Sequence, residues 1–83
     1  MTYFVYLIGN YRNKKMTTYV GYTNNLVKRL KLHNSGKGAK FTRGRVWKLL
    51  YFEKFSTKKE AILREYYIKK NKKLRNKIKK RFL

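Results

Sequence analysis

A large excess of positive charge is the feature that most limits how this chain can fold. Its 83 residues include 24 Lys and Arg against three Glu and one His, which gives a formal net charge of +21. Repulsion of this size costs stability, and it is readily understood when the usual partner is a polyanion. Because 42% of the residues are hydrophobic and 17% aromatic, we expect the charge on a folded body and not on a disordered tail. Nucleic acid is the leading candidate partner.

The length of the chain predicts one domain over residues 1–83, because a chain this short buries only about 60–65% of the surface exposed on unfolding. No cysteine is present, so neither a disulfide scaffold nor a Cys-based zinc site is available, and a lone His33 cannot hold a structural zinc. No apolar run approaches the roughly 20 residues that span a bilayer, and the N-terminus opens on a strand pattern. We therefore expect a cytoplasmic protein that does not enter the membrane.

The N-terminal third of the chain predicts a β-hairpin. Residues 2–8 are dense in aromatic and β-branched side chains and stop at Gly9-Asn10, which is typical of a strand followed by a turn. Residues 10–16 are then the connection, and 17–23 form the second strand. The short connection favours antiparallel pairing of the two tyrosine-rich strands.

The remainder of the chain predicts three helices and one more strand. We expect a helix at residues 26–35 and a Gly-rich basic loop at 34–45. An apolar strand suited to the centre of the sheet follows at 46–55, and two helices follow at 58–70 and 74–82. Thr57 followed by Glu60 has the pattern of a capping box at the start of the second helix. The order of strand, strand, helix, strand, helix and helix predicts an α+β fold.

Glu65 differs from the other two glutamates. Glu60 has a capping role, and Glu53 lies at the frayed end of a strand, whereas Glu65 projects from or beside the apolar face of its helix. A salt bridge to Lys69 is one interpretation of such a residue. The alternative is a ligand for Mg²⁺ or Mn²⁺, since one or two carboxylates suffice for one ion, although a two-metal site needs more acids than this chain has.

Four further residues have both a structural and a chemical interpretation. Arg29 is either a phosphate clamp or one more solvated cation, and His33, on the same helix face, is either a proton carrier or a half-buried structural residue. Tyr6 and Tyr19 taken alone are packing residues with hydroxyls directed at water. None of the four residues proves catalysis by itself.

Two basic segments are expected to meet phosphates. The Gly-Lys-Gly-Ala-Lys stretch lacks the spacing of a phosphate-binding P-loop and is better interpreted as a mobile basic loop. From this loop we expect nucleic-acid contacts by Lys37, Lys40, Arg43 and Arg45. The basic run at residues 69–81 has three interpretations: a solvated helix face, a lipid-binding surface or a phosphate-binding surface. We prefer phosphate binding.

Two tripeptides and three single residues carry a resemblance to a known family. Phe4-Val5-Tyr6 and Tyr19-Val20-Gly21 lie on the two expected N-terminal strands, Arg29 and His33 on the first helix, and Glu65 on the second. Together they resemble the GIY-YIG nuclease domain, in particular its short stand-alone bacterial form (UPF0213-like), which is related to the nuclease domain of structure-specific nucleases. The resemblance covers roughly residues 3 to 75.

A longer match supports the same resemblance. The stretch from His33 to Gly44, His-Asn-Ser-Gly-Lys-Gly-Ala-Lys-Phe-Thr-Arg-Gly, closely resembles the loop of that bacterial subgroup. The chain departs from the family pattern at Phe4, where glycine is frequent, and at Val20, where isoleucine is usual. Neither departure removes a catalytic group.

The resemblance implies a small three-stranded antiparallel sheet flanked by helices and hydrolysis of a phosphodiester bond with one Mg²⁺ or Mn²⁺ ion. In that scheme Glu65 holds the metal, Arg29 stabilises the pentacovalent transition state, and Tyr6, helped by Tyr19 and His33, positions or deprotonates the attacking water. The base is left open among these residues. The resemblance also favours DNA over RNA, with a link to repair or recombination and a partner protein that sets target choice.

Two other hypotheses compete with the metal-dependent endonuclease. A non-catalytic nucleic-acid-binding module accounts equally well for the charge and the aromatic content, and its binding would show the same salt dependence. A membrane-surface protein rests on the charge pattern of the C-terminal helix alone. Cutting of nucleic acid separates the first hypothesis from both.

Overall fold

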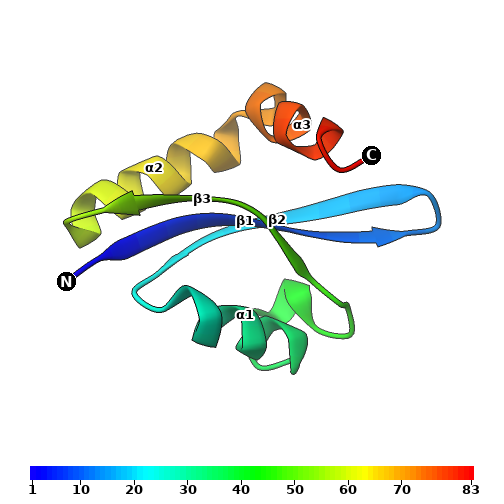
Figure 1. Cartoon of the computed structure of the whole chain (residues 1–83), viewed down its shortest axis with the longest axis horizontal. Helices are drawn as coiled ribbons and strands as arrows, with labels where there is room; N and C mark the ends of the chain where they lie inside the picture. The colour runs from blue at the N-terminus through cyan, green and yellow to red at the C-terminus, as the bar shows by residue number, and fades with distance from the viewer.

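The protein folds into a three-stranded antiparallel sheet with helices on both faces (Figure 1). A computed structural model describes all 83 residues. The strand order in the sheet is β2-β1-β3. The elements are β1 (Tyr3–Arg12), β2 (Lys15–Thr23), α1 (Leu26–Asn34), a 3-10 turn (Lys40–Thr42), β3 (Lys48–Phe55), α2 (Lys58–Lys70) and α3 (Lys72–Lys80). Both the predicted α+β class and the predicted order of elements are confirmed.

The hairpin is longer than the sequence suggested, and the predicted connection at 10–16 is wrong. Pairing continues to the end of the strands, where Arg12 lies opposite Lys15. The chain reverses at Asn13 and Lys14, with φ angles of 53° and 62°. Positive φ at both central residues is what a tight two-residue hairpin turn requires. Asn10, predicted to be a turn residue, is instead paired with Thr17 within the sheet.

The central strand is β1 and not β3, which corrects the expected place of the third strand. Residues 5–10 of β1 are all buried, whereas β3 has no buried residue and alternates between half-buried and exposed positions. A strand with both faces covered belongs between two neighbours. The edge position of β3 leaves Phe52 exposed.

Side chains cap all three helices. Asn25 accepts a hydrogen bond from the amide of Lys28 at 3.1 Å at the start of α1. Thr57 accepts from the amide of Glu60 at 3.2 Å and donates its hydroxyl proton to the Glu60 carboxylate at 2.8 Å. The start of α2 predicted from Thr57 and Glu60 is therefore confirmed, but the Glu60 carboxylate bonds the Thr57 hydroxyl and not the Thr57 amide, as a full capping box would require. Asn71 caps α3.

The sheet separates two hydrophobic clusters, because successive side chains of a strand point to opposite faces. One face of β1 packs Val5 and Leu7 under α2 and α3. The other face carries Tyr6 and Ile8 together with Trp47, and α1 covers it (Figure 1). The alternation of side chains along β1 therefore places Tyr6 on the α1 face.

Helix α2 contacts the sheet along a narrow stripe of small and branched residues. Ala61 and Ile68 are buried, but Ile62 and Tyr66 are 41% and 62% exposed. Residues seven apart lie on one helix face, and the intermediate ones turn outward. The helices are too short and polar for any of them to cross a membrane.

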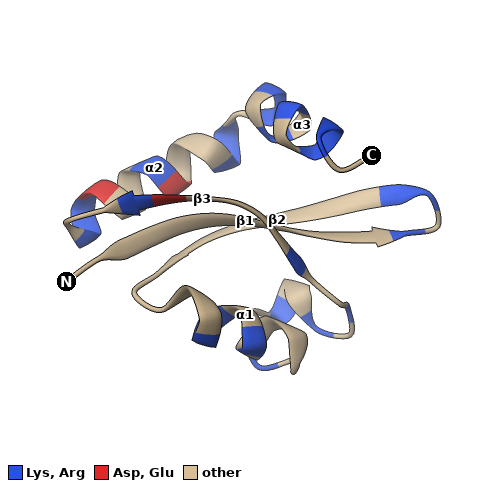
Figure 2. Cartoon of the chain, viewed as in Figure 1, with Lys and Arg blue, Asp and Glu red and all other residues tan.

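Charge is distributed unevenly over this frame. Lys and Arg occur on every helix and at the hairpin tip, whereas the glutamates lie only on β3 and α2 (Figure 2). The α1 face and the end of the hairpin carry no acidic residue at all. An anion approaching these surfaces meets positive charge only.

Candidate active site

Tyr6 lies across its neighbouring strand because a glycine stands opposite. Tyr6 pairs with Gly21 of β2, and a Cβ atom added to Gly21 would fall 2.6 Å from Cζ of the tyrosine ring. Real Cβ atoms do not approach other atoms so closely. The absence of a side chain at Gly21 therefore gives the phenol ring its path over β2.

His33 is fully enclosed and bonded at both ring nitrogens. It has no exposed surface, with Nε2 at 2.7 Å from the Tyr6 hydroxyl and Nδ1 at 2.9 Å from Oγ1 of Thr42. The edge of its ring packs on Tyr19, with 5.2 Å between the ring centroids. Gly38 passes so close that a Cβ there would lie 2.9 Å from Cε1 of His33. These contacts leave His33 a single orientation.

The loop that carries Thr42 is held in place by Trp47. The indole Nε1 of Trp47 donates to the carbonyl oxygen of Thr42 at 2.9 Å, and Asn34 exchanges two hydrogen bonds with the Trp47 backbone. The basic loop is thus tied at both ends to buried groups. These hydrogen bonds anchor both ends of a loop that was predicted to be mobile.

The hydrogen bonds of Thr42 determine the tautomer of His33. The Thr42 hydroxyl lies 2.8 Å from the carbonyl oxygen of Ala39, which can only accept, and 3.1 Å from the Ala39 amide, which can only donate. A hydroxyl has one proton to give, so Oγ1 must accept from Nδ1 of His33. The imidazole proton is therefore on Nδ1, and Nε2 accepts the hydroxyl proton of Tyr6.

The surroundings keep both partners neutral at neutral pH. Burial raises the pKa of Tyr6, and the negative charge of Glu65 acts in the same direction, while Arg29 opposes them. Burial and the nearby Arg29 guanidinium lower the pKa of His33. A neutral phenol donating to a neutral imidazole agrees with the tautomer given by Thr42. The interpretation of Tyr6 as a packing residue with its hydroxyl in water is wrong.

Arg29 lies beside this pair on α1. Its charge acts on Tyr6 and on His33, and its Nε atom is buried without a hydrogen-bond partner. A buried guanidinium nitrogen without an acceptor is costly, which favours an anionic ligand at this position. The structure thus brings Tyr6, Tyr19, Arg29 and His33 together.

Glu65 lies on α2, which covers the opposite face of the sheet from α1 (Figure 1). The Glu65 side chain is 17% exposed, and one oxygen lies 3.3 Å from Nζ of Lys69, so the predicted salt bridge is present. A partly exposed ion pair of this kind stabilises a helix by only about 0.3–0.5 kcal/mol. The negative charge of Glu65 is the smallest of the influences that raise the pKa of Tyr6, and the place of Glu65 in the site remains a prediction of the family resemblance.

Glu53 provides a contrast with Glu65. It lies within β3 and not at a frayed end, and both of its oxygens bind the Arg64 guanidinium, at 2.8 and 2.9 Å. The Arg64 hydrogen bonds hold the pKa of Glu53 below its usual range. Tyr51 also donates its hydroxyl to this carboxylate. Both oxygens of Glu53 are therefore bonded to protein groups, whereas Glu65 has one oxygen without a protein partner.

Glu65 can bind one divalent cation only if water and substrate supply most of the ligands. No group of three or more His, Cys, Asp or Glu side chains occurs that could hold a metal ion. An ion at this position would therefore be held by Glu65, with water and substrate oxygens as its other ligands. Such a small number of protein ligands is common for Mg²⁺.

A hollow of about 400 Å³ gives access to the site at the edge of β2. Tyr19 and Phe41 line it on one side, and Lys69, the partner of Glu65, lines it on the other, with Arg75 from α3. The largest hollow of the molecule is elsewhere, at the end of the hairpin. A substrate phosphate can therefore approach between the tyrosine side and the glutamate side.

The four loop residues predicted to bind nucleic acid divide into two groups. Lys37 and Lys40 are exposed on the loop beside His33, whereas Arg43 and Arg45 line the hollow at the hairpin end. Gly21, Gly38 and Thr42 lie in the segments that carry the family resemblance, but sequence reasoning gave none of them a role. Gly21 could have been identified from its pairing with Tyr6, had the hairpin turn been placed correctly, but no sequence signal indicates the role of Thr42.

Comparison with known families agrees with this site. The family model described as the GIY-YIG catalytic domain matches residues 2–79. The chain therefore belongs to the GIY-YIG catalytic domain family, whose name denotes a nuclease type of function. The family resemblance seen in the sequence is confirmed.

Within that family the chain is similar to UPF0213 proteins. It is 56% identical over 68 residues to one from Clostridium perfringens, with 81% of this chain and 70% of the relative covered. It is 66% identical over 53 residues to one from Bacillus licheniformis, with 63% and 55% covered. The matched segment is thus only part of each relative's length.

A solved structure has the same fold. The solution structure of a UPF0213 protein from Bacillus halodurans is 37% identical and aligns with a TM-score of 0.51. The alignment covers 93% of this chain and 80% of the other chain. The three-stranded sheet with flanking helices is therefore shared with that UPF0213 protein.

Proposed function

We propose that this chain is a divalent-metal-dependent endonuclease that hydrolyses phosphodiester bonds in DNA. The observation that carries the proposal is the buried series of hydrogen bonds from Tyr6 through His33 to Thr42, which ends at a phenol beside Arg29 and Glu65. Membership of a nuclease family supports the same chemistry. The choice of DNA, the metal and the roles of single residues are parts of the proposal.

The direction of the hydrogen bonds makes Tyr6 a route for a proton. Because its own proton is donated to Nε2 of His33, the Tyr6 oxygen has lone pairs free to accept. As water attacks phosphorus, its proton passes to the Tyr6 oxygen, and the Tyr6 proton passes to Nε2. His33 then carries a positive charge and still donates from Nδ1 to Thr42. This arrangement is general base catalysis through two residues.

We assign the two tasks of the base to two residues. Tyr6 is the group that meets the water, and His33 is the group that finally holds the proton. Burial and Arg29 lower the pKa of His33, so the imidazolium is a stronger acid than a free one, and after the bond from phosphorus to the leaving oxygen has broken it returns its proton through Tyr6 to water. Tyr19 packs on the ring of His33 and fixes its orientation.

Arg29 and Glu65 serve the phosphate. The Arg29 guanidinium can donate two parallel hydrogen bonds to phosphate oxygens and so stabilise the charge of the pentacovalent transition state. Glu65 would hold the divalent cation through the oxygen that Lys69 does not use. One such ion, when bound, supplies positive charge to the scissile phosphate and the leaving oxygen.

The family resemblance also supports a proposal for the substrate and the cellular role. It includes branched DNA as a substrate, a setting in repair or recombination, a cytoplasmic location and a partner protein that sets target choice. A non-catalytic nucleic-acid-binding module is the second candidate, and it is favoured by the net charge of +21 alone.

Cutting assays with matched variants test the proposal. Wild type, Glu65→Gln and the control Glu60→Gln are incubated with labelled duplex, single-stranded, flap and four-way-junction DNA, with and without Mg²⁺ or Mn²⁺, and binding is measured in parallel. Glu60 lies on the same helix, and glutamine also serves in a capping box. We expect metal-dependent nicking by wild type and Glu60→Gln, and binding without nicking by Glu65→Gln. Binding without nicking by all three proteins would leave the binding module as the function.

A further inference from the structure

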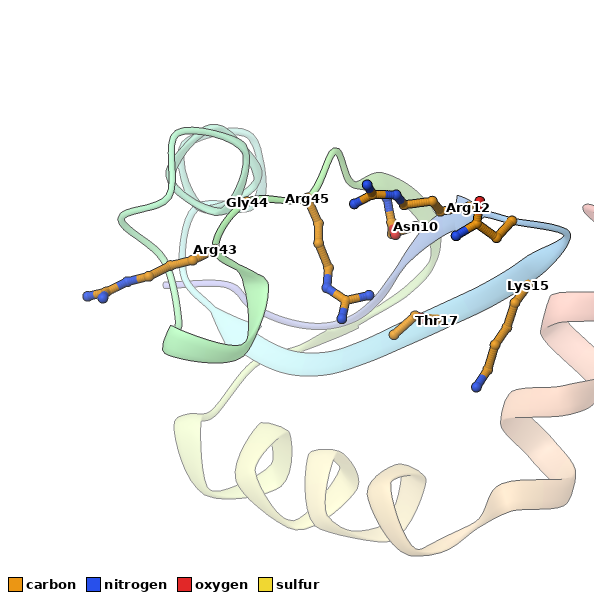
Figure 3. Close-up of a pocket in the computed structure, with 8 residues that line it drawn as sticks. Asn10, Arg12, Lys15, Thr17, Arg43, Gly44 and Arg45 are labelled. Carbon is orange, nitrogen blue, oxygen red and sulfur yellow. The ribbon is translucent and has the colours of Figure 1, made fainter.

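The largest hollow of the molecule is built almost entirely from hydrogen-bond donors. It has a volume of about 560 Å³ and no hydrophobic residue in its lining. Arg12, Lys15 and Thr17 contribute from the end of the hairpin, and Arg43 and Arg45 from the loop after the 3-10 turn (Figure 3). We call this hollow the cationic pocket. No acidic side chain lines it.

The protein offers the cations of this pocket no counter-charge. The salt bridges of the structure use Arg64 and Lys69, neither of which belongs to the pocket. Side chains of like charge that lie near one another without an acid repel each other and attract anions, although the Arg43 side chain points away from the other three cations in Figure 3. The lack of apolar lining excludes an acyl chain or a stacked base as the main contact. A phosphate group is the anion that arginine side chains bind best, through two parallel hydrogen bonds.

One acceptor in the pocket wall lacks a donor. Asn10 is 8% exposed and donates from Nδ2 to the carbonyl oxygen of Val46 at 2.8 Å. Its Oδ1 atom is buried and has no partner. Buried polar atoms without partners are rare and need an explanation. A neighbouring guanidinium that turns to bind an anion can donate a hydrogen bond from one of its remaining N–H groups to Oδ1.

The cationic pocket lies on the same face of the sheet as the candidate active site. Tyr6, Ile8, Asn10 and Arg12 alternate along β1 and share one face. From Tyr6 to Asn10 the strand advances four residues, or about 13 Å at roughly 3.3 Å per residue.

Aromatic side chains connect the two places. The Arg45 guanidinium lies 5.5 Å from the centre of the Phe41 ring. Phe41 stacks on Tyr19, with 6.0 Å between the ring centroids, and Tyr19 packs on His33. A strand of nucleic acid can therefore follow a continuous surface from the candidate active site to Arg45.

From these observations we infer that the cationic pocket is a second phosphate-binding subsite, which holds a backbone phosphate of the substrate a few nucleotides from the scissile one. This inference rests on the proposed function for the identity of the substrate. The subsite orients the strand by its charge, and it takes no part in bond cleavage. Its specificity is for phosphate and not for base sequence.

A charge-matched pair of double variants provides the first test. Arg12→Ala/Lys15→Ala removes two cations from the pocket, and Lys58→Ala/Lys59→Ala removes two exposed cations from the first turn of α2. We expect about tenfold weaker binding of a 20-base-pair duplex by the pocket variant than by the control. Its plot of log K against log salt should also be shallower by about 0.9, the value for one phosphate contact. Equal affinity and slope for the two variants would overturn the inference.

Nuclear magnetic resonance distinguishes the two sources of phosphate. Amide shifts are followed while inorganic phosphate or a single-stranded octanucleotide is added to the Glu65→Gln protein. The octanucleotide should shift residues 10–17 and 43–45 together with those around Tyr6, at concentrations well below those needed for inorganic phosphate. Tighter binding of inorganic phosphate in the pocket would contradict the inference, and so would oligonucleotide shifts that leave the pocket residues unchanged.

Neither test requires cutting. A chain that never nicks DNA can still show the affinity loss and the pocket shifts, in which case only the proposed nuclease function fails. A chain that nicks DNA but binds equally well in both double variants retains the nuclease function and loses the subsite.

Discussion

The candidate active site and the cationic pocket lie on one face of the same hairpin but are built in opposite ways. In the first, Tyr6, His33 and Thr42 are buried, neutral at neutral pH and joined by hydrogen bonds. In the second, arginine and lysine side chains surround open space without any counter-charge. Packing determines the properties of the first region, and net charge determines those of the second. Single atoms should matter in the active site, whereas only charge and salt should matter in the pocket.

Tyr6→Phe should give the largest effect, because it removes one oxygen and little else. Loss of the proton route should lower the cutting rate by about 10²–10⁴-fold, the usual contribution of general base catalysis. Nε2 of His33 also loses its partner, which should cost about 1–3 kcal/mol of unfolding free energy. Rate and binding are measured on the same DNA. A wild-type rate in this variant would remove Tyr6 from the mechanism.

Gly21→Ala should disturb the same ring from the opposite strand. The added Cβ would lie 2.6 Å from Cζ of Tyr6, and overpacking of this kind costs about 1–3 kcal/mol. Unfolding in urea measures the cost, alone and in a Tyr6→Ala background where the ring is absent. The two substitutions should not be additive. An equal cost in both backgrounds would show that the ring contact is not the cause.

Thr42→Val and Thr42→Ser separate the hydroxyl from the shape of the side chain. Valine removes the acceptor for Nδ1–H of His33, so we expect a loss of about 1–2 kcal/mol in unfolding free energy and a mixture of imidazole tautomers. Serine keeps the hydroxyl, and the Nδ1–H tautomer should persist. Nitrogen shifts of the imidazole ring report the tautomer directly. A wild-type ring protonated at Nε2 would contradict the assignment.

The sequence predicted elements well where local chemistry determined them. Thr57 and Glu60 gave the start of α2 correctly, since a capping box involves only neighbours in the chain. The hairpin turn was misplaced because Asn13 and Lys14 adopt positive φ without a glycine to indicate it.

The candidate site was predicted in part. The family motifs indicated Tyr6, His33 and Glu65, but the bonds between them join residues far apart in the chain, such as Tyr6 and His33. The burial of His33 and the acceptor role of Thr42 depend on how the loop packs against Trp47. No local pattern encodes such contacts, which explains why both interpretations of His33 were open at first.

Acid should weaken the fold through the buried cluster. The pKa of His33 is lowered below its ordinary value of 6.5 by burial and by Arg29, so the unfolded chain binds a proton that the folded chain rejects. Stability therefore falls as the pH drops below about 6.5. Urea unfolding at pH 7.5 and 5.5 measures the change. His33 is the sole histidine, and the lowered pKa of Glu53 keeps that carboxylate ionised throughout this range.

The smallest effect is expected in the cationic pocket, and it tests the comparison from the other side. Arg12→Ala removes an exposed cation without a protein partner, so the free energy of unfolding should change by no more than about 0.5 kcal/mol. The change should favour the folded state, because the chain loses one of its 24 positive charges, and added salt should reduce this gain. Arg64→Ala is the control, since Arg64 binds both oxygens of Glu53 and its loss should destabilise clearly more. A destabilisation by Arg12→Ala as large as that of the control would mean that the pocket cations support the fold, and the distinction between a packed site and a charged one would fail.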